Sequence, residues 1–348
     1  MKIKNFEINN QGKVFIIAEL SANHNGDLQT AIETIKAAKR AGADCIKLQT
    51  YTADTITIDS DKQDFIIKDT IWSGRKLHEL YQEAHTPWEW HETLYMAAEE
   101  EGLICFSSPF DKTAVDFLEK LNTPAYKIAS FEITDIPLIE YVASMGKPII
   151  ISTGIAELED IELAVETCRK AGNNQIALLK CTSSYPAPIN EANMCMVNDL
   201  ATRFNVISGL SDHTMGATVP IVATAFGAKI IEKHFILDRS IGGPDASFSM
   251  NEKEFTDMVK AIREAESAIG VVNYTLTEKQ KKGKDFSRSL YVVEEIKEGE
   301  IFTEKNLKSI RPGFGLHPKY YSKILGRKAN KNLSKGDRFN LEYLSIEA

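Results

Sequence analysis

Several common features are missing from this 348-residue sequence, and each absence excludes a class of protein. There is no CxxC pair, and the five cysteines (Cys45, Cys105, Cys168, Cys181 and Cys195) are an odd number. Most of them lie in apolar runs, which favours buried free thiols in a reducing cytoplasm over disulfides or a zinc site. No apolar run reaches the roughly 18 residues that span a bilayer, and the N-terminal stretch lacks the apolar core of a signal peptide. We therefore expect a cytoplasmic protein that does not bind a membrane.

A general excess of positive charge is also absent, since the net charge is −8. The charge is unevenly distributed: residues 276–348 carry 16 Lys and Arg against 10 Asp and Glu, whereas residues 1–275 carry 25 against 39. An acidic body argues against nucleic-acid binding. The basic C-terminal piece could dock on that body or meet an anionic ligand.

What the sequence does contain is a regular alternation of short apolar runs and amphipathic helical stretches. The runs predict strands at 14–19, 45–50, 103–110, 125–130, 148–154, 176–185, 206–213 and 228–235. Their continuous apolar character is typical of parallel strands covered on both faces. Eight such units in about 260 residues predict a (β/α)8 barrel. A doubly wound sheet is the alternative, but ELSANHNG stands where its glycine-rich turn would follow the first strand.

The pattern changes near residue 275, where TLTEKQKKGKDFSR is polar and basic. We expect the barrel to occupy residues 1–275, a linker 276–285, and a small, mostly β domain 286–348. A domain of about 60 residues is marginally stable alone. It would therefore lean on the barrel or on a second subunit.

Polar residues collect at all eight predicted strand ends, which is where barrels of this kind carry their active sites. A single capping serine or solvent-reaching lysine would have a structural explanation. A lysine inside an apolar strand is different, because it must meet an anion or accept a strongly lowered pKa. Lys47, Lys127 and Lys233 are such residues. Together with the strand-end hydroxyls they suit binding of a phosphate and a carboxylate, and a Schiff-base lysine is the alternative use.

His213 and His234 stand near the ends of consecutive predicted strands. Neighbouring parallel strands lie about 4.8 Å apart, so two imidazoles there can share one divalent cation and leave positions for water and substrate. The alternative is a pair of hydrogen-bonded structural histidines. Alternation along IIEKHF places Glu232 and His234 on one face and Lys233 on the other. Glu19, at the rim, is either a general base or the salt-bridge partner of a lysine.

Nine blocks in order resemble the N-acetylneuraminate (sialic acid) synthase family: IIAELSANHNG, IKLQTY, SSPF, YKIASFE, ISTGIA, LKCTSSYP, GLSDHT, IIEKHFILD and RPGFGLHP. ELSANH, DTIWSGRKLHELYQEAHTPWEWH and RPGFGLHPKYY are similar to its pseudaminic acid synthase branch. The resemblance implies a (β/α)8 TIM barrel followed by an antifreeze-like (SAF, β-clip) domain, in a domain-swapped homodimer. It also implies condensation of phosphoenolpyruvate with an amino-sugar aldehyde, in this branch 2,4-diacetamido-2,4,6-trideoxy-L-altrose.

The resemblance further implies residue roles. Glu19 would be the catalytic glutamate, His213 and His234 would hold Mn²⁺, Mg²⁺ or Co²⁺, and Arg311 would reach the sugar in the partner's barrel. Contacts to phosphoenolpyruvate would come from Lys47, Lys127, Ser130, Ser152 and Ser211, with Ser184 and Tyr185 as further contacts. The first block departs from the family's common E-I-G-x-N-H form, which leaves the role of the loop after Glu19 open.

Other functions remain to be weighed. An N-acetylneuraminate or legionaminate synthase would use another amino-sugar, and a Schiff-base aldolase would use Lys127 or Lys233. A carbohydrate-binding protein without catalysis is the non-enzymatic alternative. Trp72, Trp88 and Trp90, in the stretch 51–90, are either specificity elements or packing residues.

Overall fold

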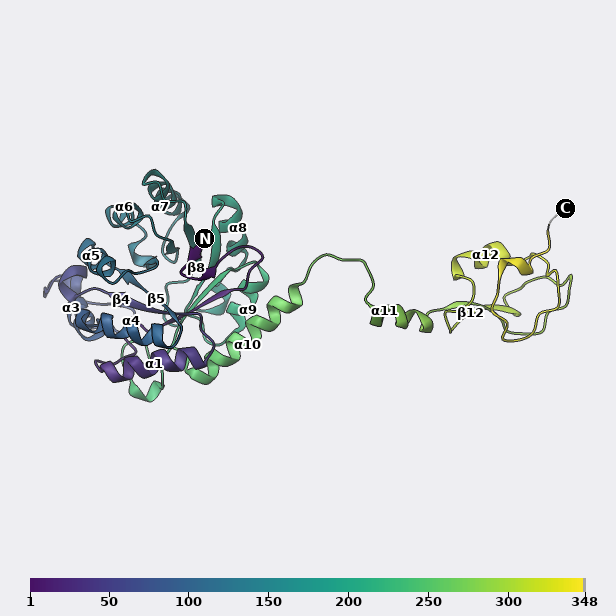
Figure 1. Ribbon diagram of the computed structural model, residues 1–348, viewed down its shortest axis with the longest axis horizontal. Coiled ribbons are helices and arrows are strands. Elements are labelled where there is room, and N and C mark those ends of the chain that lie inside the picture. The colour runs from purple at the N-terminus through teal and green to yellow at the C-terminus, as the bar shows by residue number, and fades with distance from the viewer. Residues whose placement is uncertain (347–348) are drawn as a thin grey trace. The chain divides into compact units, whose positions relative to one another are not determined.

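The computed structural model describes residues 1–346, so the last two residues of the predicted domain 286–348 lie outside the described part. The chain divides into two compact units between Gly270 and Val271 (Figure 1). None of the described helices combines the length and apolar character needed to cross a membrane.

The first unit is the predicted barrel. Within the described chain, eight parallel strands close in the order β10-β3-β4-β5-β6-β7-β8-β9. They are β3 (Phe15–Glu19), β4 (Cys45–Thr50), β5 (Ile104–Pro109), β6 (Tyr126–Ile128), β7 (Ile149–Ser152), β8 (Ile176–Cys181), β9 (Ile207–Asp212) and β10 (Ile230–His234). Each lies inside its predicted range, which confirms the fold class.

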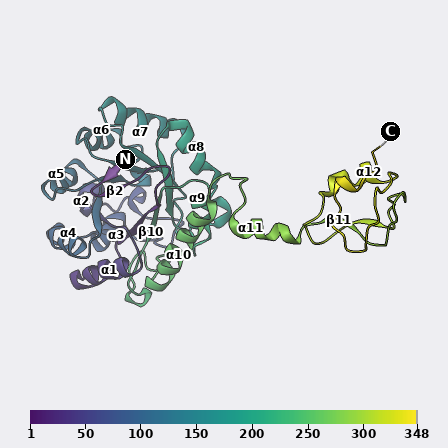
Figure 2. The same ribbon diagram turned by 45° about the vertical axis from the view of Figure 1, so that its right-hand side comes forward.

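Helices surround the strands (Figure 2). They are α1 (Leu28–Arg40), α4 (His91–Glu100), α5 (Lys112–Lys120), α6 (Ile136–Ser144), α7 (Leu158–Lys170), α8 (Cys195–Phe204), α9 (Thr218–Ala225) and α10 (Glu252–Ile269). Two shorter helices, α2 (Ala53–Ile56) and α3 (Leu77–Ala84), lie in the long connection between β4 and α4. Gly42 and Gly172 follow α1 and α7 with positive φ, a conformation that ends a helix without steric cost in glycine.

Side chains alternate between two apolar cores along each strand. On β3, Ile16 and Ala18 pack in a cluster that includes Phe255 of α10, whereas Phe15 and Ile17 belong to a separate cluster formed by the barrel strands. Both sets are buried, which explains why the strands appear in the sequence as unbroken apolar runs.

A short N-terminal hairpin closes one end of the barrel. Its strands, β1 (Lys2–Ile3) and β2 (Phe6–Glu7), pair antiparallel, and no sequence pattern predicted them. Ile3 and Ile8 are buried in the same cluster as Phe15 and Ile104, the first residues of β3 and β5. The hairpin therefore covers the amino-terminal ends of the strands and leaves their carboxyl ends for the site.

The second unit is small, and it combines a two-stranded sheet with isolated β-bridges and short helices. It contains α11 (Glu278–Gly283), β11 (Ser289–Val292), β12 (Leu307–Ile310) and α12 (Tyr321–Ile324). Isolated bridges such as Leu290 to Leu316 and Ile296 to Leu333 extend the β11–β12 pair around a core that includes Phe302 and Phe339. The segment 276–285, which we expect to be a linker, contains α11.

Candidate active site

Four ionisable side chains form a buried charge cluster at the carboxyl ends of the barrel strands. Glu19 lies between neighbours on both sides, because its backbone pairs with that of Lys47 on β4 and with that of His234 on β10. The Lys47 ammonium contacts the Glu19 carboxylate and lies 3.5 Å from Glu232 Oε1, and Lys127 Nζ lies 3.6 Å from the same oxygen. None of the four side chains is more than 7% exposed. Glu19 does therefore pair with a lysine, and its role as a base stays a prediction.

The two carboxyl groups of this cluster differ in pKa. Burial raises the pKa of Glu19 to about 7, with Lys47 opposing this effect and the charge of Glu232 adding to it. Burial also acts to raise the pKa of Glu232, but Lys127, Lys47 and a hydrogen bond from Ser211 outweigh it, so the pKa is lowered. Glu232 is thus the ionised member of the pair, and Glu19 is the carboxyl that can exchange a proton near neutral pH.

Hydroxyl groups surround the charge cluster. Ser211 Oγ donates to Glu232 Oε1 at 3.1 Å, and Lys47 Nζ donates to Ser108 Oγ at 3.3 Å. Ser152 Oγ is buried and has no hydrogen-bond partner among the described residues. An unused hydroxyl at the same barrel end as two buried ammonium groups suits an anionic ligand.

Gly154, which follows β7, packs against the hydroxyls of Ser130 and Ser183, and we name these three residues the hydroxyl-lined cradle. Its N–H donates to Ser130 Oγ at 3.1 Å. A Cβ at this position would stand 2.1 Å from Ser183 Oγ and 2.7 Å from Ser130 Oγ. Only glycine therefore fits without moving both hydroxyls.

His213 and His234 meet beside the cluster, with ring centroids 5.4 Å apart. His213 Nδ1 lies 3.1 Å from the carbonyl oxygen of Thr182, so an Nδ1–H donated there leaves Nε2 as a metal-binding lone pair. His234 Nδ1 is buried without a hydrogen-bond partner among the described residues, and Asp245 Oδ2 lies 3.7 Å away. Burial lowers the pKa of His234, which keeps its imidazole neutral.

These features fit a divalent cation with two imidazole ligands. No group of three or more His, Cys, Asp or Glu side chains in residues 1–346 is arranged to hold a metal. Water and substrate would therefore supply the remaining ligands, as a Lewis-acid site requires.

Lys233 lies on the opposite strand face, as the alternation predicted. Its Nζ donates to Asp212 Oδ2 and to the Thr214 carbonyl oxygen, both at 2.5 Å. This fixed position weakens the Schiff-base hypothesis for Lys233.

The remaining predicted site residues are more dispersed. Tyr185 lies against His213, with ring centroids 4.3 Å apart, whereas the Ser184 hydroxyl donates to Pro186 O at 3.3 Å. Arg311 directly follows β12 in the second unit, where it is exposed.

Sequence reasoning assigned no role to several residues of the site. For Glu232 the sequence holds one signal: strand alternation places its side chain on the same face as that of His234. Asp245 accepts from Ser21 Oγ at 2.6 Å, and Phe248 lies 5.0 Å from His234, but both come from a loop without periodicity. Cys181 ends β8 with its Sγ 3.8 Å from His213 Nδ1. Burial acts to raise the pKa of this thiol, but contacts with His213 and Ser130 lower it to about 7.

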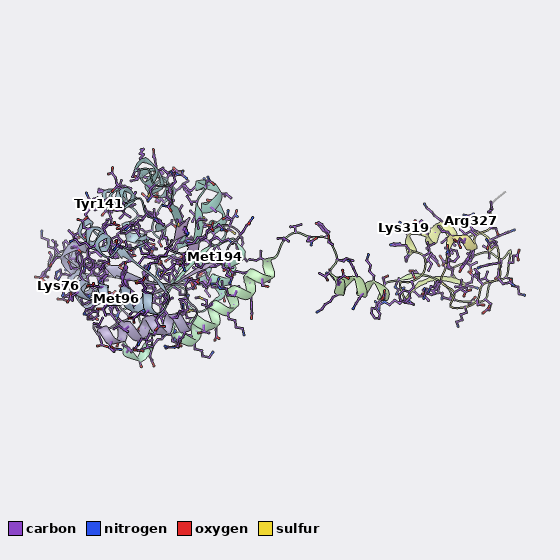
Figure 3. The ribbon with its side chains drawn as sticks, viewed as in Figure 1. Lys76, Met96, Tyr141, Met194, Lys319 and Arg327 are labelled. Carbon is purple, nitrogen blue, oxygen red and sulfur yellow. The ribbon has the colours of Figure 1, made fainter. Side chains whose placement is uncertain are left out.

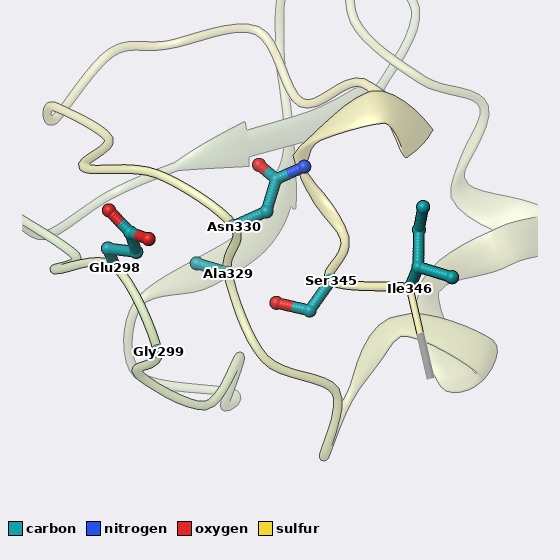
Figure 4. Close-up of a pocket in the computed structure, with 6 residues that line it drawn as sticks. All are labelled: Glu298, Gly299, Ala329, Asn330, Ser345 and Ile346. Carbon is teal, nitrogen blue, oxygen red and sulfur yellow. The ribbon is translucent and has the colours of Figure 1, made fainter. Parts of the chain in front are cut away.

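A separate depression exists in the second unit (Figure 4), lined by Glu298, Gly299, Ala329, Asn330, Ser345 and Ile346. Its polar groups serve the fold: the Asn330 amide donates to Glu342 O, and the Gly299 N–H donates to Ala329 O. None of the six lining residues is a cation or a histidine that could bind an anion or activate the hydroxyl of Ser345, so this depression is not a candidate active site.

The fold and the site together define a class of protein: a parallel barrel with buried lysines and a histidine pair at its mouth, followed by a small second unit. Residues 34–274 match the NeuB family and residues 287–338 match the SAF domain. The chain belongs to the NeuB family, which confirms the resemblance.

Characterised relatives cover almost the whole chain. The pseudaminic acid synthase of Campylobacter jejuni subsp. jejuni (strain 81-176) is 51% identical over 337 residues, which is 97% of this chain and 98% of that protein. The pseudaminic acid synthase of Helicobacter pylori is 49% identical over 319 residues, 91% of this chain and 94% of that protein. Among solved structures, N-acetylneuraminic acid (sialic acid) synthetase from Leptospira borgpetersenii, in complex with citrate, has a TM-score of 0.73 and 29% identity, covering 81% of this chain and 94% of that one.

Proposed function

We propose that the chain is a pseudaminic acid synthase. It condenses phosphoenolpyruvate with the open-chain aldehyde of 2,4-diacetamido-2,4,6-trideoxy-L-altrose and releases phosphate. The observation that carries this proposal is the buried cluster of Glu19, Lys47, Lys127 and Glu232 beside His213 and His234. The level of identity to two pseudaminic acid synthases supports the sugar.

Lys47 and Lys127 bind the phosphate and carboxylate of phosphoenolpyruvate in this proposal. Both ammonium groups are buried, where their interaction with an anion is stronger than in water. Ser130, Ser152 and Ser211 add hydrogen bonds, and Ser184 and Tyr185 are further contacts. Glu232 brings the ammonium groups of Lys47 on β4 and Lys127 on β6 together, because both lie near the same carboxylate oxygen.

A divalent cation (Mn²⁺, Mg²⁺ or Co²⁺) held by His213 and His234 supplies Lewis-acid polarisation of the aldehyde oxygen when bound. Carbon 3 of phosphoenolpyruvate forms a bond to the aldehyde carbon while the carbon–carbon and carbonyl π bonds break, and water adds at carbon 2. The proton that this water loses balances the one that converts the aldehyde oxygen to a hydroxyl. The bond from carbon 2 to the phosphate oxygen then breaks, and phosphate leaves. Glu19 takes the proton of the attacking water, a task suited to a carboxyl with a pKa of about 7.

Product mass measurement tests the proposal. The enzyme is offered phosphoenolpyruvate with a panel of amino-sugars that includes the substrates of N-acetylneuraminate and legionaminate synthases. We expect the nonulosonic acid from the diacetamido altrose sugar and an equal amount of phosphate. Preference for another sugar would contradict the substrate assignment. Borohydride in the presence of pyruvate should trap no adduct, whereas a trapped lysine adduct would favour the Schiff-base aldolase.

We further propose a domain-swapped homodimer in the cytoplasm. The basic character of residues 276–348 suits a lid over bound anionic phosphoenolpyruvate in the partner's barrel. The five free cysteines suit a reducing compartment. The partner subunit's Arg311 would reach the sugar. Mixing Arg311→Ala subunits with Glu19→Gln subunits should restore activity in heterodimers, because one of the two sites then has both residues. Verified heterodimers without activity would contradict the swap.

A further inference from the structure

The three tryptophans of the chain lie in different surroundings, although all belong to the connection between β4 and α4. Trp88 stacks on Phe117 with centroids 4.8 Å apart, and its indole N–H donates to Tyr51 O at 3.2 Å. Trp90 packs against the hydrophobic cluster that contains Ile16 and Phe255. Both are therefore packing residues. Trp72 has a different position.

Trp72 crosses the mouth of the barrel. Its indole N–H donates to Pro244 O at 3.2 Å, in the connection after β10, and its ring centroid lies 5.7 Å from that of Tyr185, in the connection after β8. In the closed strand order, β4 and β8 stand on opposite sides of the barrel. A segment that leaves β4 thus reaches the far rim.

The segment around Trp72 is held in place at its base. Ile66 and Lys76 form an antiparallel bridge, and a turn from Thr70 to Ser73 places Trp72 at the tip. Lys76 (labelled in Figure 3) also pairs with Asp61 at 2.5 Å. Trp72 is therefore presented by an ordered hairpin-like loop, which reduces the entropy lost when a ligand binds against it.

Two further aromatic rings, those of Tyr185 and Phe248, connect Trp72 to the histidine pair. Tyr185 lies 5.2 Å from Phe248 and 4.3 Å from His213, and Phe248 lies 5.0 Å from His234. Trp72 and Tyr185 are half-buried, whereas Phe248 is buried, and none of the three rings belongs to the four hydrophobic clusters of the described residues. We name Trp72, Tyr185 and Phe248 the aromatic wall. It gives the mouth an apolar side directly next to the residues that would hold the aldehyde end of the sugar.

We propose that the aromatic wall selects the sugar by its methyl groups, with Trp72 as the main specificity residue. This inference rests on the proposed function. The proposed sugar carries a methyl at carbon 6 and a second acetamido group at carbon 4, where a common 2-acetamido hexose carries hydroxyl groups. An aromatic face favours methyl groups, and a hydroxyl placed against it loses water without gaining a partner. Pockets of this kind combine apolar walls with a few polar anchors.

The test compares kcat/KM for two sugars, 2,4-diacetamido-2,4,6-trideoxy-L-altrose and 2-acetamido-2-deoxymannose, in wild type and variants. Trp72→Ala should lower kcat/KM for the diacetamido sugar by roughly 10- to 200-fold, the range for losing a small apolar contact surface. The value for the hydroxylated sugar should fall much less, and KM for phosphoenolpyruvate should stay unchanged. Trp72→Phe, which keeps a ring but loses the bond to Pro244, should recover most of the preference. Trp88→Phe is the matched control and should behave as wild type.

A binding measurement provides a second readout. In the Trp88→Phe/Trp90→Phe background, Trp72 is the only tryptophan. The alditol of the diacetamido sugar, which has no aldehyde and cannot condense, should shift its fluorescence to shorter wavelength. The alditol of 2-acetamido-2-deoxymannose should do so only at higher concentration.

The outcomes separate the two proposals. A wild-type enzyme that makes no product from the diacetamido sugar would overturn the proposed substrate, and this inference with it. An active wild type whose Trp72→Ala variant keeps the same preference between the sugars would overturn this inference alone. Equal losses in Trp72→Phe and Trp72→Ala, together with a raised KM for phosphoenolpyruvate, would also overturn it, because Trp72 would then only hold the loop.

Discussion

The barrel buries lysines on both faces of its strands, and the acidic partners of these lysines differ in how completely they are hydrogen-bonded. On the outer face, Lys233 is bound by Asp212 and Thr214, and both Asp212 oxygens also accept hydrogen bonds from Thr214. At the mouth, Lys47 and Lys127 share Glu232, whose Oε2 has no hydrogen-bond partner among the described residues. A structural ion pair satisfies its polar atoms, whereas a binding site leaves some unsatisfied. Buried charge alone therefore does not identify a functional site.

Replacing a lysine on each face should give the largest contrast. Lys47→Met removes one partner of a buried charge pair, which costs about 2–5 kcal/mol in binding and corresponds to roughly 30- to 5,000-fold in kcat/KM for phosphoenolpyruvate. Lys233→Met should instead lower the free energy of unfolding by about 3–5 kcal/mol, because it leaves Asp212 buried and unpaired.

Chemical denaturation and steady-state kinetics on both variants check this contrast. Lys233→Met combined with Asp212→Asn provides a folded control, since it removes both charges of the outer pair. Loss of activity in that double variant, at a phosphoenolpyruvate concentration that saturates wild type, would show that the outer face also serves binding.

A smaller effect is expected from Gly154→Ala. The new Cβ would displace Ser130 and Ser183, and losing a hydrogen bond to a charged ligand costs about 1.5–3 kcal/mol, so KM for phosphoenolpyruvate should rise roughly 10- to 150-fold. Gly283→Ala is the control, because no atom lies within 4 Å of a Cβ built there. An unchanged KM in Gly154→Ala would exclude the hydroxyl-lined cradle as the phosphate site.

The smallest expected effect is the change in kcat/KM for each unit of pH. Glu19 acts as a base only when it is deprotonated, and its pKa is about 7. Acidification below this value should therefore lower kcat/KM about tenfold per pH unit. The residual activity of Glu19→Gln should lack this acidic limb. An identical limb in that variant would assign the titration to another group.

Much of the barrel could be predicted because its signal is local. Each strand is an apolar run, and strand alternation separates Lys233 from Glu232 and His234. The N-terminal hairpin escaped prediction because strands of two residues have no period. Asp245, Phe248 and the partners of Trp72 escaped because they lie in connections whose course depends on distant contacts. The sequence names Trp72, Trp88 and Trp90 as equal candidates for a specificity role. Only the contacts of Trp72 with Tyr185 and Pro244, which the structure shows, distinguish it from the other two.

The seam of the barrel has a consequence for biosynthesis. Phe15 pairs with Ile230 and Glu19 pairs with His234. The first strand of the barrel, β3, therefore cannot complete its pairing until the last strand, β10, has been synthesised. Such distant pairing makes folding slow and leaves sheet edges open meanwhile. Glu19 and His234 face each other across this seam, so a nascent chain has no working site until the ring is closed. Closure of the barrel and assembly of its chemistry are thus one and the same folding event.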